Sequence, residues 1–477
     1  MCSLNACLCD INNDITSKSD TIENLFTDLC KKCQSNNTKI ILRKKDGYCK
    51  SCFLTSSTHK FRASLGKSKI IRRGDTVLVG YCGRDNSTAL LHFIKSGMSE
   101  TAHKRLIFNV LVFFIDDGSV EGYTVNERKN LLEAIDEQVQ TFGFVGYTAS
   151  LKESLCENTI PSIYPLEAKE VVIDENEVIQ KMLSNLADDS AREELLRQLR
   201  HRLLILAARK LGCNKVFVAD CATNIAINIL SDISLGRGAQ LSPDIDFSDT
   251  RYSDVMLLRP MRDFTKEEIS HYLSCNNLNS IRSCKQNRIS SSTSIQALTS
   301  KFISQLDSDF HGTVSTVFRT GEKLSTELLV CQNLEDNCAL CNIPLDTKVI
   351  NDDISALQAT TLSSLLSSKN LNVNNSKETT DPLNVSVDTL KAQMCCRHKN
   401  INETECVCNI KEYKRSELST LSSNTVLKHL CYSCQLIFRY SDVANCVPSF
   451  VLNTIQTRKI YPFKLSSTWM SHMHKLP

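Results

Sequence analysis

The chain has 477 residues, 42% of them hydrophobic and 23% charged, which is enough for two or three domains with at least one large core. Its formal net charge of +3 excludes a uniformly basic protein, so any surface for nucleic acid must be local. The longest apolar run, residues 106–115, is too short to span a membrane. The first ten residues lack a secretory signal, so we expect a cytoplasmic protein without a membrane partner.

The first elements along the chain are a polar stretch and two close cysteine pairs. Residues 1–29 contain few aromatics, which predicts a flexible N-terminus, and residues 30–58 form the predicted first module. Because a reducing compartment disfavours disulfides, metal binding is the leading interpretation for clusters among the 23 cysteines. Two tight turns joined by a hairpin, signalled by Asp46-Gly47, are typical of a structural zinc ribbon, whose ligands here are Cys30, Cys33, Cys49 and Cys52. Reduced, unliganded cysteines are the alternative.

A basic strip follows this module. Its six residues lie within fourteen positions and are Lys60, Arg62, Lys67, Lys69, Arg72 and Arg73. With Phe61 as its one aromatic residue, the strip predicts contact with an RNA backbone more than stacking on bases. A solvated charged face is the alternative.

Short apolar runs then alternate with amphipathic stretches, within a predicted domain at residues 59–330. The predicted strands, rich in Val, Ile and Phe, are residues 76–79, 110–115, 142–147, 216–219 and 255–258. The predicted helices are residues 87–96, 125–140, 191–210, 222–231 and 294–306. This alternation predicts an α/β fold with a parallel sheet and crossover helices on both faces.

A short polar loop separates the first strand of this domain from its helix. It comprises Cys82, Gly83, Arg84, Asp85, Asn86 and Ser87. Backbone amides at the start of a helix bind anions, so this geometry suits a phosphate. An ordinary strand-to-helix connection is the alternative.

Other basic residues leave two interpretations open. Arg237, between two glycines, is either a phosphate contact or an exposed loop residue. Those within residues 191–210 indicate an ordinary amphipathic face and are Arg192, Arg197, Arg200, His201 and Arg202.

The C-terminal third contains a second possible zinc module, residues 331–345 and 427–477, interrupted by a polar insertion at 346–426 that we expect to be disordered. Long loops cost little more to close than short ones, so one shared site is predicted from Cys338, Cys341, Cys431 and Cys434. Further cysteines and a histidine lie inside the insertion in no common spacing and are Cys395, Cys396, His398, Cys406 and Cys408. They favour no third site.

Several segments in order resemble one family. They are the two sets of cysteine pairs and residues 59–67, 211–220, 234–240, 259–269 and 314–323. The chain resembles the cytoplasmic tRNA 2-thiolation protein 2 family, the second subunit of the cytosolic thiouridylase and a degenerate member of the ATP-pyrophosphatase (PP-loop) superfamily. The resemblance implies a heterodimer with the catalytic thiouridylase subunit. It also implies 2-thiolation of the wobble uridine in tRNAs for Lys, Glu and Gln, with sulfur from a thiocarboxylated ubiquitin-related modifier protein.

The chain departs from the active superfamily at three points. The phosphate loop of that superfamily is Ser-Gly-Gly-x-Asp-Ser, but Arg84 replaces its second glycine, where a side chain would resist a positive φ, and neutral Asn86 replaces its aspartate. Residues 184–190 lack the cysteine pair of active thiolases. Residues 218–223 replace their Gly-His-x-x-Asp-Asp motif.

These losses disfavour ATP binding and predict a non-catalytic subunit. An ATP-dependent tRNA sulfurtransferase active by itself is the alternative. Cys82 and Cys221, both at strand ends, are either sulfur relays or buried core cysteines.

Overall fold

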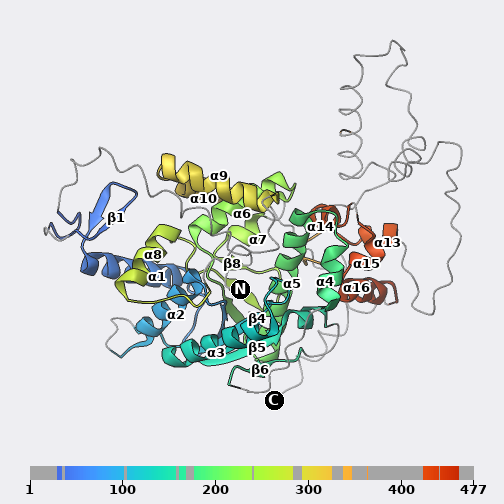
Figure 1. Cartoon of the computed structure of the whole chain (residues 1–477), viewed down its shortest axis with the longest axis horizontal. Helices are drawn as coiled ribbons and strands as arrows, with labels where there is room; N and C mark the ends of the chain where they lie inside the picture. Colours follow the sequence, from blue (N-terminus) through green and yellow to red (C-terminus); the bar gives the residue numbers. More distant parts are fainter. Residues whose placement is uncertain are drawn as a thin grey trace, which may run out of the picture. The chain divides into compact units, whose positions relative to one another are not determined.

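The structure is a computed structural model of the chain (Figure 1). It describes residues 29–34, 38–100, 105–156, 161–167, 177–238, 241–282, 293–324, 337–345, 363, 423–439 and 441–460. Internal contacts divide the chain into Met1–Thr347 with Ser423–Pro477, and Lys348–Ser422. The predicted flexible N-terminus, the predicted insertion and the cysteines within that insertion lie almost entirely outside the described residues.

A seven-stranded sheet forms the centre of the first unit, with the order β6-β5-β4-β3-β7-β9-β8. The inner strands are parallel to one another and are β5 (Val145–Ser150), β4 (Asn109–Asp116), β3 (Thr76–Tyr81), β7 (Lys215–Phe217) and β9 (Met256–Leu258). The edge strands β6 (Tyr164–Pro165) and β8 (Ser248–Asp249) are antiparallel to their neighbours. The predicted α/β fold with a parallel sheet is therefore confirmed.

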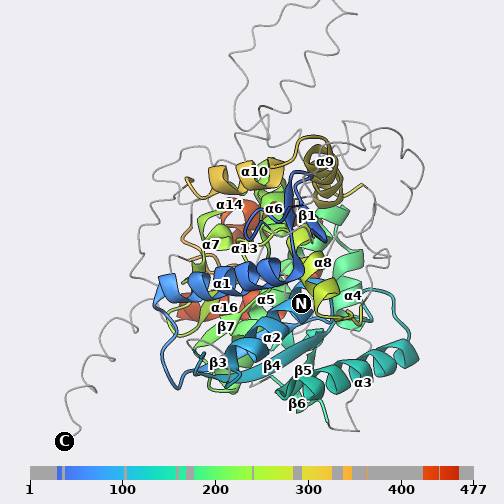
Figure 2. The ribbon, with the colours of Figure 1, turned by 90° about the vertical axis from the view of Figure 1, so that its left-hand side faces the viewer.

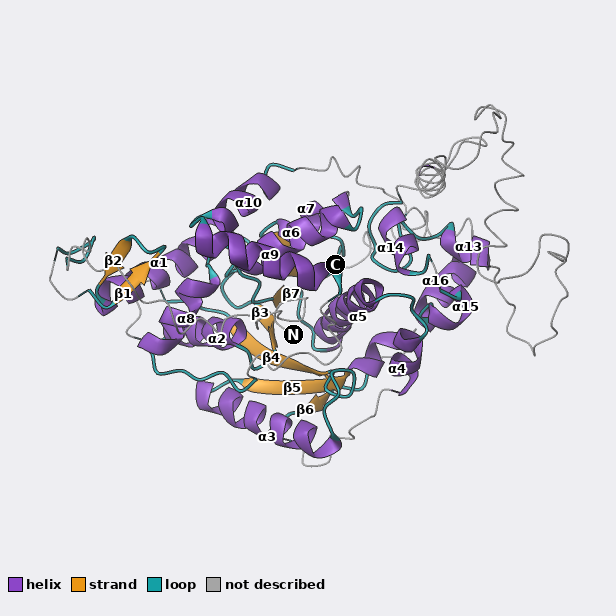
Figure 3. Cartoon of the chain, turned by 45° about the horizontal axis from the view of Figure 1, so that its top comes forward, coloured by secondary structure: helices purple, strands orange, loops and turns teal. Residues whose placement is uncertain are grey.

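Helices cover both faces of the sheet, as predicted. On one face, a shared apolar core joins the sheet to α1 (Lys50–Ser68), α2 (Asp85–Met98), α3 (Val125–Phe142) and α8 (Lys266–Cys275) (Figure 2). On the other face, α5 (Asp189–Lys210) packs against β4 and β7 (Figure 3). Alternate residues of a strand point to opposite faces. The strands are apolar on both sides for that reason, as with Val77 and Leu78, each fully buried.

The remaining helices form two further groups. Beside the sheet lie α4 (Glu177–Ser184), α6 (Ala222–Ser234), α7 (Leu241–Ile245), α9 (Ile295–Asp309), α10 (Thr313–Gly321) and the 3₁₀ helix η1 (Leu151–Leu155), and residues of α6, α7, α9 and α10 share a second apolar core. The C-terminal helices are α13 (Ser423–Leu427), α14 (Tyr432–Ile437), α15 (Val443–Cys446) and α16 (Ser449–Ile460). Among these, α14 contacts α5 and α15 contacts α4.

The predicted start of one strand and the predicted turn of the N-terminal hairpin are wrong. The strand expected from residue 142 begins at Val145, because α3 continues to Phe142 and ends on Gly143, whose φ of +77° favours glycine. The predicted N-terminal hairpin is present as β1 (Ile40–Leu42) and β2 (Asp46–Tyr48), but its turn lies at Arg43 and Lys44, both with positive φ. Asp46-Gly47, expected to mark that turn, belongs to β2.

The order of the inner strands locates the best place for a ligand. The chain runs outward from β3 to β4 and β5, then returns to the other side of β3 through β7 and β9. Open α/β sheets bind ligands at the carboxyl ends of the strands where the order reverses. Here that place lies between the loop after β3 and the loop after β7. In addition, α1 runs through the boundary predicted between residues 58 and 59, so the N-terminal module and the sheet share a helix.

Candidate functional site

The predicted phosphate loop has the expected strand–loop–helix geometry. Gly83 has a φ of +76°, and Arg84, which directly precedes α2, has a φ of −95°. The expected steric conflict at Arg84 is therefore wrong, because the residue does not adopt the left-handed conformation. The effect of having arginine in place of glycine comes instead from the side chain, which pairs with Glu121.

The loop is covered by another segment of the chain. The backbone N–H groups of Ile281 and Arg282 both donate to the carbonyl oxygen of Gly83, each at 2.9 Å. A Cβ atom on Gly83 would lie 3.5 Å from Ile281 Cβ and 3.6 Å from Arg282 Cγ. Residues 281 and 282 therefore occupy the space directly above the loop.

Buried ion pairs fill the adjoining carboxyl edge of the sheet. Arg200 Nη2 lies 2.6 Å from Asp117 Oδ2, and Arg84 Nη2 lies 3.5 Å from Glu121 Oε1. Arg282 pairs with both carboxylates, at 3.4 Å from Asp117 and closer still to Glu121. All five side chains are less than 9% exposed. The cluster carries one positive charge in excess, and the arginines donate to carboxylates of the chain itself.

These pairs also set the protonation of the cluster. Burial raises the pKa of Asp117, but Arg200 and Arg282 outweigh that effect and hold the pKa well below its usual value. Asp117 is therefore ionised at neutral pH and forms ion pairs with Arg200 and Arg282.

The other loop residues do not face a common open pocket. Asn86 and Ser87 are buried, and Ser87 Oγ donates to the carbonyl of Arg84 at 2.7 Å. Asp85 instead lines a separate pocket of about 410 Å³ beside the end of α8. The six residues thus lie in one loop between β3 and α2, as predicted, but their side chains do not line a common binding pocket.

Cys82 and Cys221 agree with the core-cysteine alternative. Both side chains are buried in the apolar core on the face of α1 and α2. Cys221 Sγ donates to Asn224 Oδ1 at 3.4 Å.

The first set of cysteine pairs converges at the N-terminal hairpin. Sulfur atoms of all four residues lie within 4.8 Å of one another, and Cys33 Sγ is 3.7 Å from Cys49 Sγ. Four sulfurs about 2.3 Å from one ion in a tetrahedron would be about 3.8 Å apart. The donor set therefore fits a single tetrahedral ion. Cys33 is exposed, so this cluster lies at the surface.

The second set converges in the same way, although 90 positions separate Cys341 from Cys431. Their sulfur atoms are 3.6 Å apart, and the sulfur atoms of Cys338, Cys341, Cys431 and Cys434 lie within 4.8 Å of one another. All four residues are buried. The C-terminal helices also contact the sheet domain elsewhere, because the guanidinium carbon of Arg202 on α5 lies 3.8 Å from the ring centroid of Phe450 on α16.

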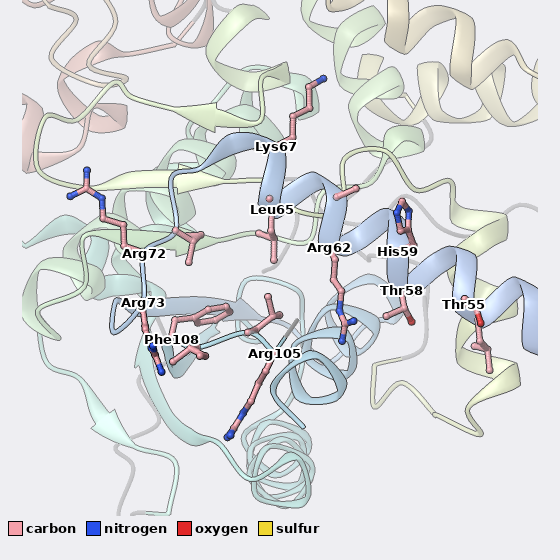
Figure 4. Close-up of a pocket in the computed structure, with 16 residues that line it drawn as sticks. Thr55, Thr58, His59, Arg62, Leu65, Lys67, Arg72, Arg73, Arg105 and Phe108 are labelled. Carbon is pink, nitrogen blue, oxygen red and sulfur yellow. The ribbon is translucent and has the colours of Figure 1, made fainter. Parts of the chain in front are cut away.

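The basic strip divides into two parts. Lys60 Nζ contacts Glu268 at 2.8 Å and lies over the ring of Phe264, so it faces α8. Lys69, exposed, follows the end of α1. The other members of the strip are brought together in one groove of about 1000 Å³, and they are Arg62, Lys67, Arg72 and Arg73 (Figure 4).

The remaining basic residues do not match either earlier interpretation. Arg237 is 1% exposed and lies 2.6 Å from Glu194, so it is neither an exposed loop residue nor a phosphate contact. Helix α5 is not an ordinary amphipathic face, because Arg197 and Arg200 are buried in ion pairs. The charges of Arg197 and Arg200 belong to the interior of the unit.

The comparisons with known proteins point to one family. The family model described as Cytoplasmic tRNA 2-thiolation protein 2 matches residues 294–436. The relative of that name from Xenopus tropicalis is 30% identical, over 90% of this chain and 91% of its own length. The human protein of that name is 28% identical, over 90% of this chain and 90% of its own. The chain belongs to this family.

Membership confirms the resemblance drawn from the sequence. The family's name describes cytoplasmic proteins of tRNA 2-thiolation, in agreement with the expected location and process. Within the described part of the chain, no helix has the length and apolar character needed to cross a membrane.

One solved structure is also similar to the chain. It is the U34-tRNA thiolase NcsA from Methanococcus maripaludis with its 4Fe-4S cluster, 16% identical in sequence. The alignment covers 65% of this chain and 93% of that one, with a TM-score of 0.47.

The sequence did not reveal the partners of Arg84. Asp117 and Glu121 follow the apolar run of β4, and polar residues at a strand end were the one available signal. Arg200 and Arg282 had none, because they meet these carboxylates only through the tertiary structure. His59 and Arg105 also line the groove of about 1000 Å³ that holds part of the basic strip. Neither was predicted, because both lie outside residues 60–73.

Proposed function

We propose that this chain is the non-catalytic, accessory subunit of a heterodimeric tRNA thiolase. The complex carries out 2-thiolation of the wobble uridine (mcm5s2U34) in tRNAs for Lys, Glu and Gln, with the catalytic thiouridylase subunit as partner. Sulfur comes from a thiocarboxylated ubiquitin-related modifier protein. Family membership supports the process, and the ion pairs at the loop support the accessory role.

The filled loop is the observation that carries the accessory role. A bound triphosphate would have to displace residues 281–282 and separate Arg282 from Asp117 and Glu121. Separating a buried ion pair costs about 3–5 kcal/mol, because each charge is left without water or a partner. Asn86 offers no carboxylate to a magnesium ion.

Two zinc ions with structural roles complete the proposal. Both sets of four sulfurs suit a closed tetrahedral site, and four thiolates leave no position open for water or substrate. Zinc here would hold elements together and supply no chemistry.

We also assign contact with tRNA to the basic strip, chiefly to the four members that line the groove. Arg62, Arg72 and Arg73 offer guanidinium groups, which suit phosphate oxygens. Lys60 contributes less, because Glu268 already binds its ammonium group.

Reconstitution with purified components tests the accessory role. The chain alone should neither convert ATP to AMP nor thiolate tRNA, and it should restore thiolation when mixed with the catalytic subunit and the sulfur donor. Thiolated tRNA is measured by its retardation in an organomercurial gel. The Asp85→Ala variant should restore thiolation as well as the unchanged chain. Adenylation of tRNA by the chain alone, lost in Asp85→Ala, would instead establish an enzyme active by itself.

A further inference from the structure

The groove beside α1 has a basic rim. Figure 4 shows Arg62, Arg73 and Arg105 on the side of α1 that faces Phe108, whereas Lys67 points to the opposite side. The positively charged and imidazole side chains that line it are His59, Arg62, Lys67, Arg72, Arg73 and Arg105. No aspartate or glutamate is among the described residues of its lining. A polyanion is the ligand that this charge favours.

The floor of the groove is apolar. Leu65 and Phe108 are buried there, Ile71 and Leu106 are half-buried, and Ile107 is 45% exposed. Phosphates gain nothing from such a floor, and base-paired nucleotides keep their ring faces stacked inside the helix. An unpaired nucleotide presents both a phosphate and an apolar ring face, so it matches the rim and the floor together.

The groove also has room for a nucleotide. Pockets of about 300–1,000 Å³ enclose a single drug-sized molecule, and this groove measures about 1000 Å³.

The groove lies apart from the predicted phosphate loop at residues 82–87. Arg72 and Arg73 come just before β3, and Arg105 comes just before β4. Because both strands are parallel, these residues lie at the amino edge of the sheet, whereas Gly83 lies at the carboxyl edge. RNA bound in the groove is therefore held away from the decayed loop of this chain.

We propose that this groove binds an unpaired segment of the tRNA, with phosphates at the arginines and at least one base against Ile107 and Leu106. This inference rests on the proposed function, which supplies tRNA as the polyanion, and it adds that the recognised part is single-stranded.

Binding of short RNAs to the full chain tests the inference. The probes are an oligouridylate of about eight nucleotides, within the site sizes of about 4–16 known for single-strand binders, and a blunt-ended duplex that has no unpaired loop. We expect the single strand to bind more tightly and to compete with tRNA. Arg73→Ala/Arg105→Ala should weaken its binding about tenfold and lower the dependence on salt. Ile107→Ser should weaken binding of the single strand and leave the duplex unchanged.

A charge-matched variant provides the control. Lys129→Ala/Lys301→Ala removes two exposed positive charges outside the groove and outside the basic strip, and should change binding little. Thermal unfolding should be the same for all variants, since the altered residues are exposed. The inference fails if the duplex binds as tightly as the single strand, or if the control weakens binding as much as the groove variant.

The two proposals fail in different ways. Should the oligouridylate not bind while reversal of Lys67, Lys69, Arg72 and Arg73 to glutamate still abolishes tRNA binding, the groove inference is wrong and the tRNA-binding role stands. Should the single strand bind in the groove while reconstitution shows no dependence on this chain, the accessory function is wrong.

Discussion

At the scale of single residues, Arg84 shows how an arginine side chain fills the edge of the sheet beside the loop after β3. Its backbone is unstrained, with a φ of −95°, and its side chain extends to Glu121 instead of leaving space for a phosphate. Arg282 and Arg200 then bind the carboxylates that remain at the strand ends. Each of the three arginines is thus bound to a carboxylate of the chain itself.

Arg282→Ala should lower the free energy of unfolding by about 3–5 kcal/mol, because it leaves Glu121 and Asp117 buried with fewer partners. Urea denaturation measures the change. Arg319→Ala, which removes an exposed arginine of α10, should shift stability by less than about 0.5 kcal/mol. Equal effects for the two variants would show that the cluster is not stabilising.

At the scale of elements, α5 is the helix that joins the parts of the unit. Its charged residues pair in several directions: Arg197 with Asp232 of α6, Arg200 with Asp117 after β4, and Arg202 with the ring of Phe450 on α16. Breaking any one of these contacts loosens a different neighbour. A helix buried nearly all round requires such partners for its charges.

Glu193 of α5 gives this arrangement a measurable pH dependence. Burial raises its pKa from an ordinary value of 4.5 to about 7, although Ser294, which precedes α9, donates to its carboxylate at 3.0 Å. Because the folded chain binds this proton more tightly, the contribution of Glu193 to stability falls as pH rises from about 4.5 to about 7 and then levels off.

Glu193→Gln should therefore be more stable than the unchanged chain above pH 7, and the two should converge toward pH 4. Melting temperatures recorded across this range measure the difference. A constant difference at every pH would contradict the raised pKa.

At the scale of the whole molecule, the two sulfur clusters differ in burial and in what they connect. The N-terminal cluster stays within one hairpin and the start of α1, and Cys33 is exposed. The C-terminal cluster joins residues on either side of the unit Lys348–Ser422, and all its members are buried. Loss of a metal ion would thus have a local effect at the first site and a wider one at the second.

Metal analysis should find about two zinc ions per chain. A chelator should remove the ion of the exposed N-terminal site first. Cys434→Ser should lower the content to about one and make the C-terminal helices sensitive to protease, because metal binding supplies folding free energy. Cys275→Ser, which alters a half-buried cysteine outside both clusters, should keep both ions. A content near zero in the unchanged chain would reject both sites.

The sequence by itself determined the features that depend on local spacing. Alternating apolar runs predicted the parallel sheet, and paired cysteines predicted both clusters, including the one whose halves are far apart in the chain. The ordered motifs identified the family. These signals are readable because side-chain periodicity and ligand spacing are properties of neighbouring residues.

Only the tertiary structure decided which charges are paired and which are available. Arg237 and Lys60 appear in the sequence as ordinary basic residues, yet one is buried against Glu194 and the other bound to Glu268. Arg282 meets Glu121 across 161 positions, and Arg105 joins the basic groove from the segment before β4. Each outcome depends on partners distant in the chain, and the fate of a charge is decided by those partners and by its access to water.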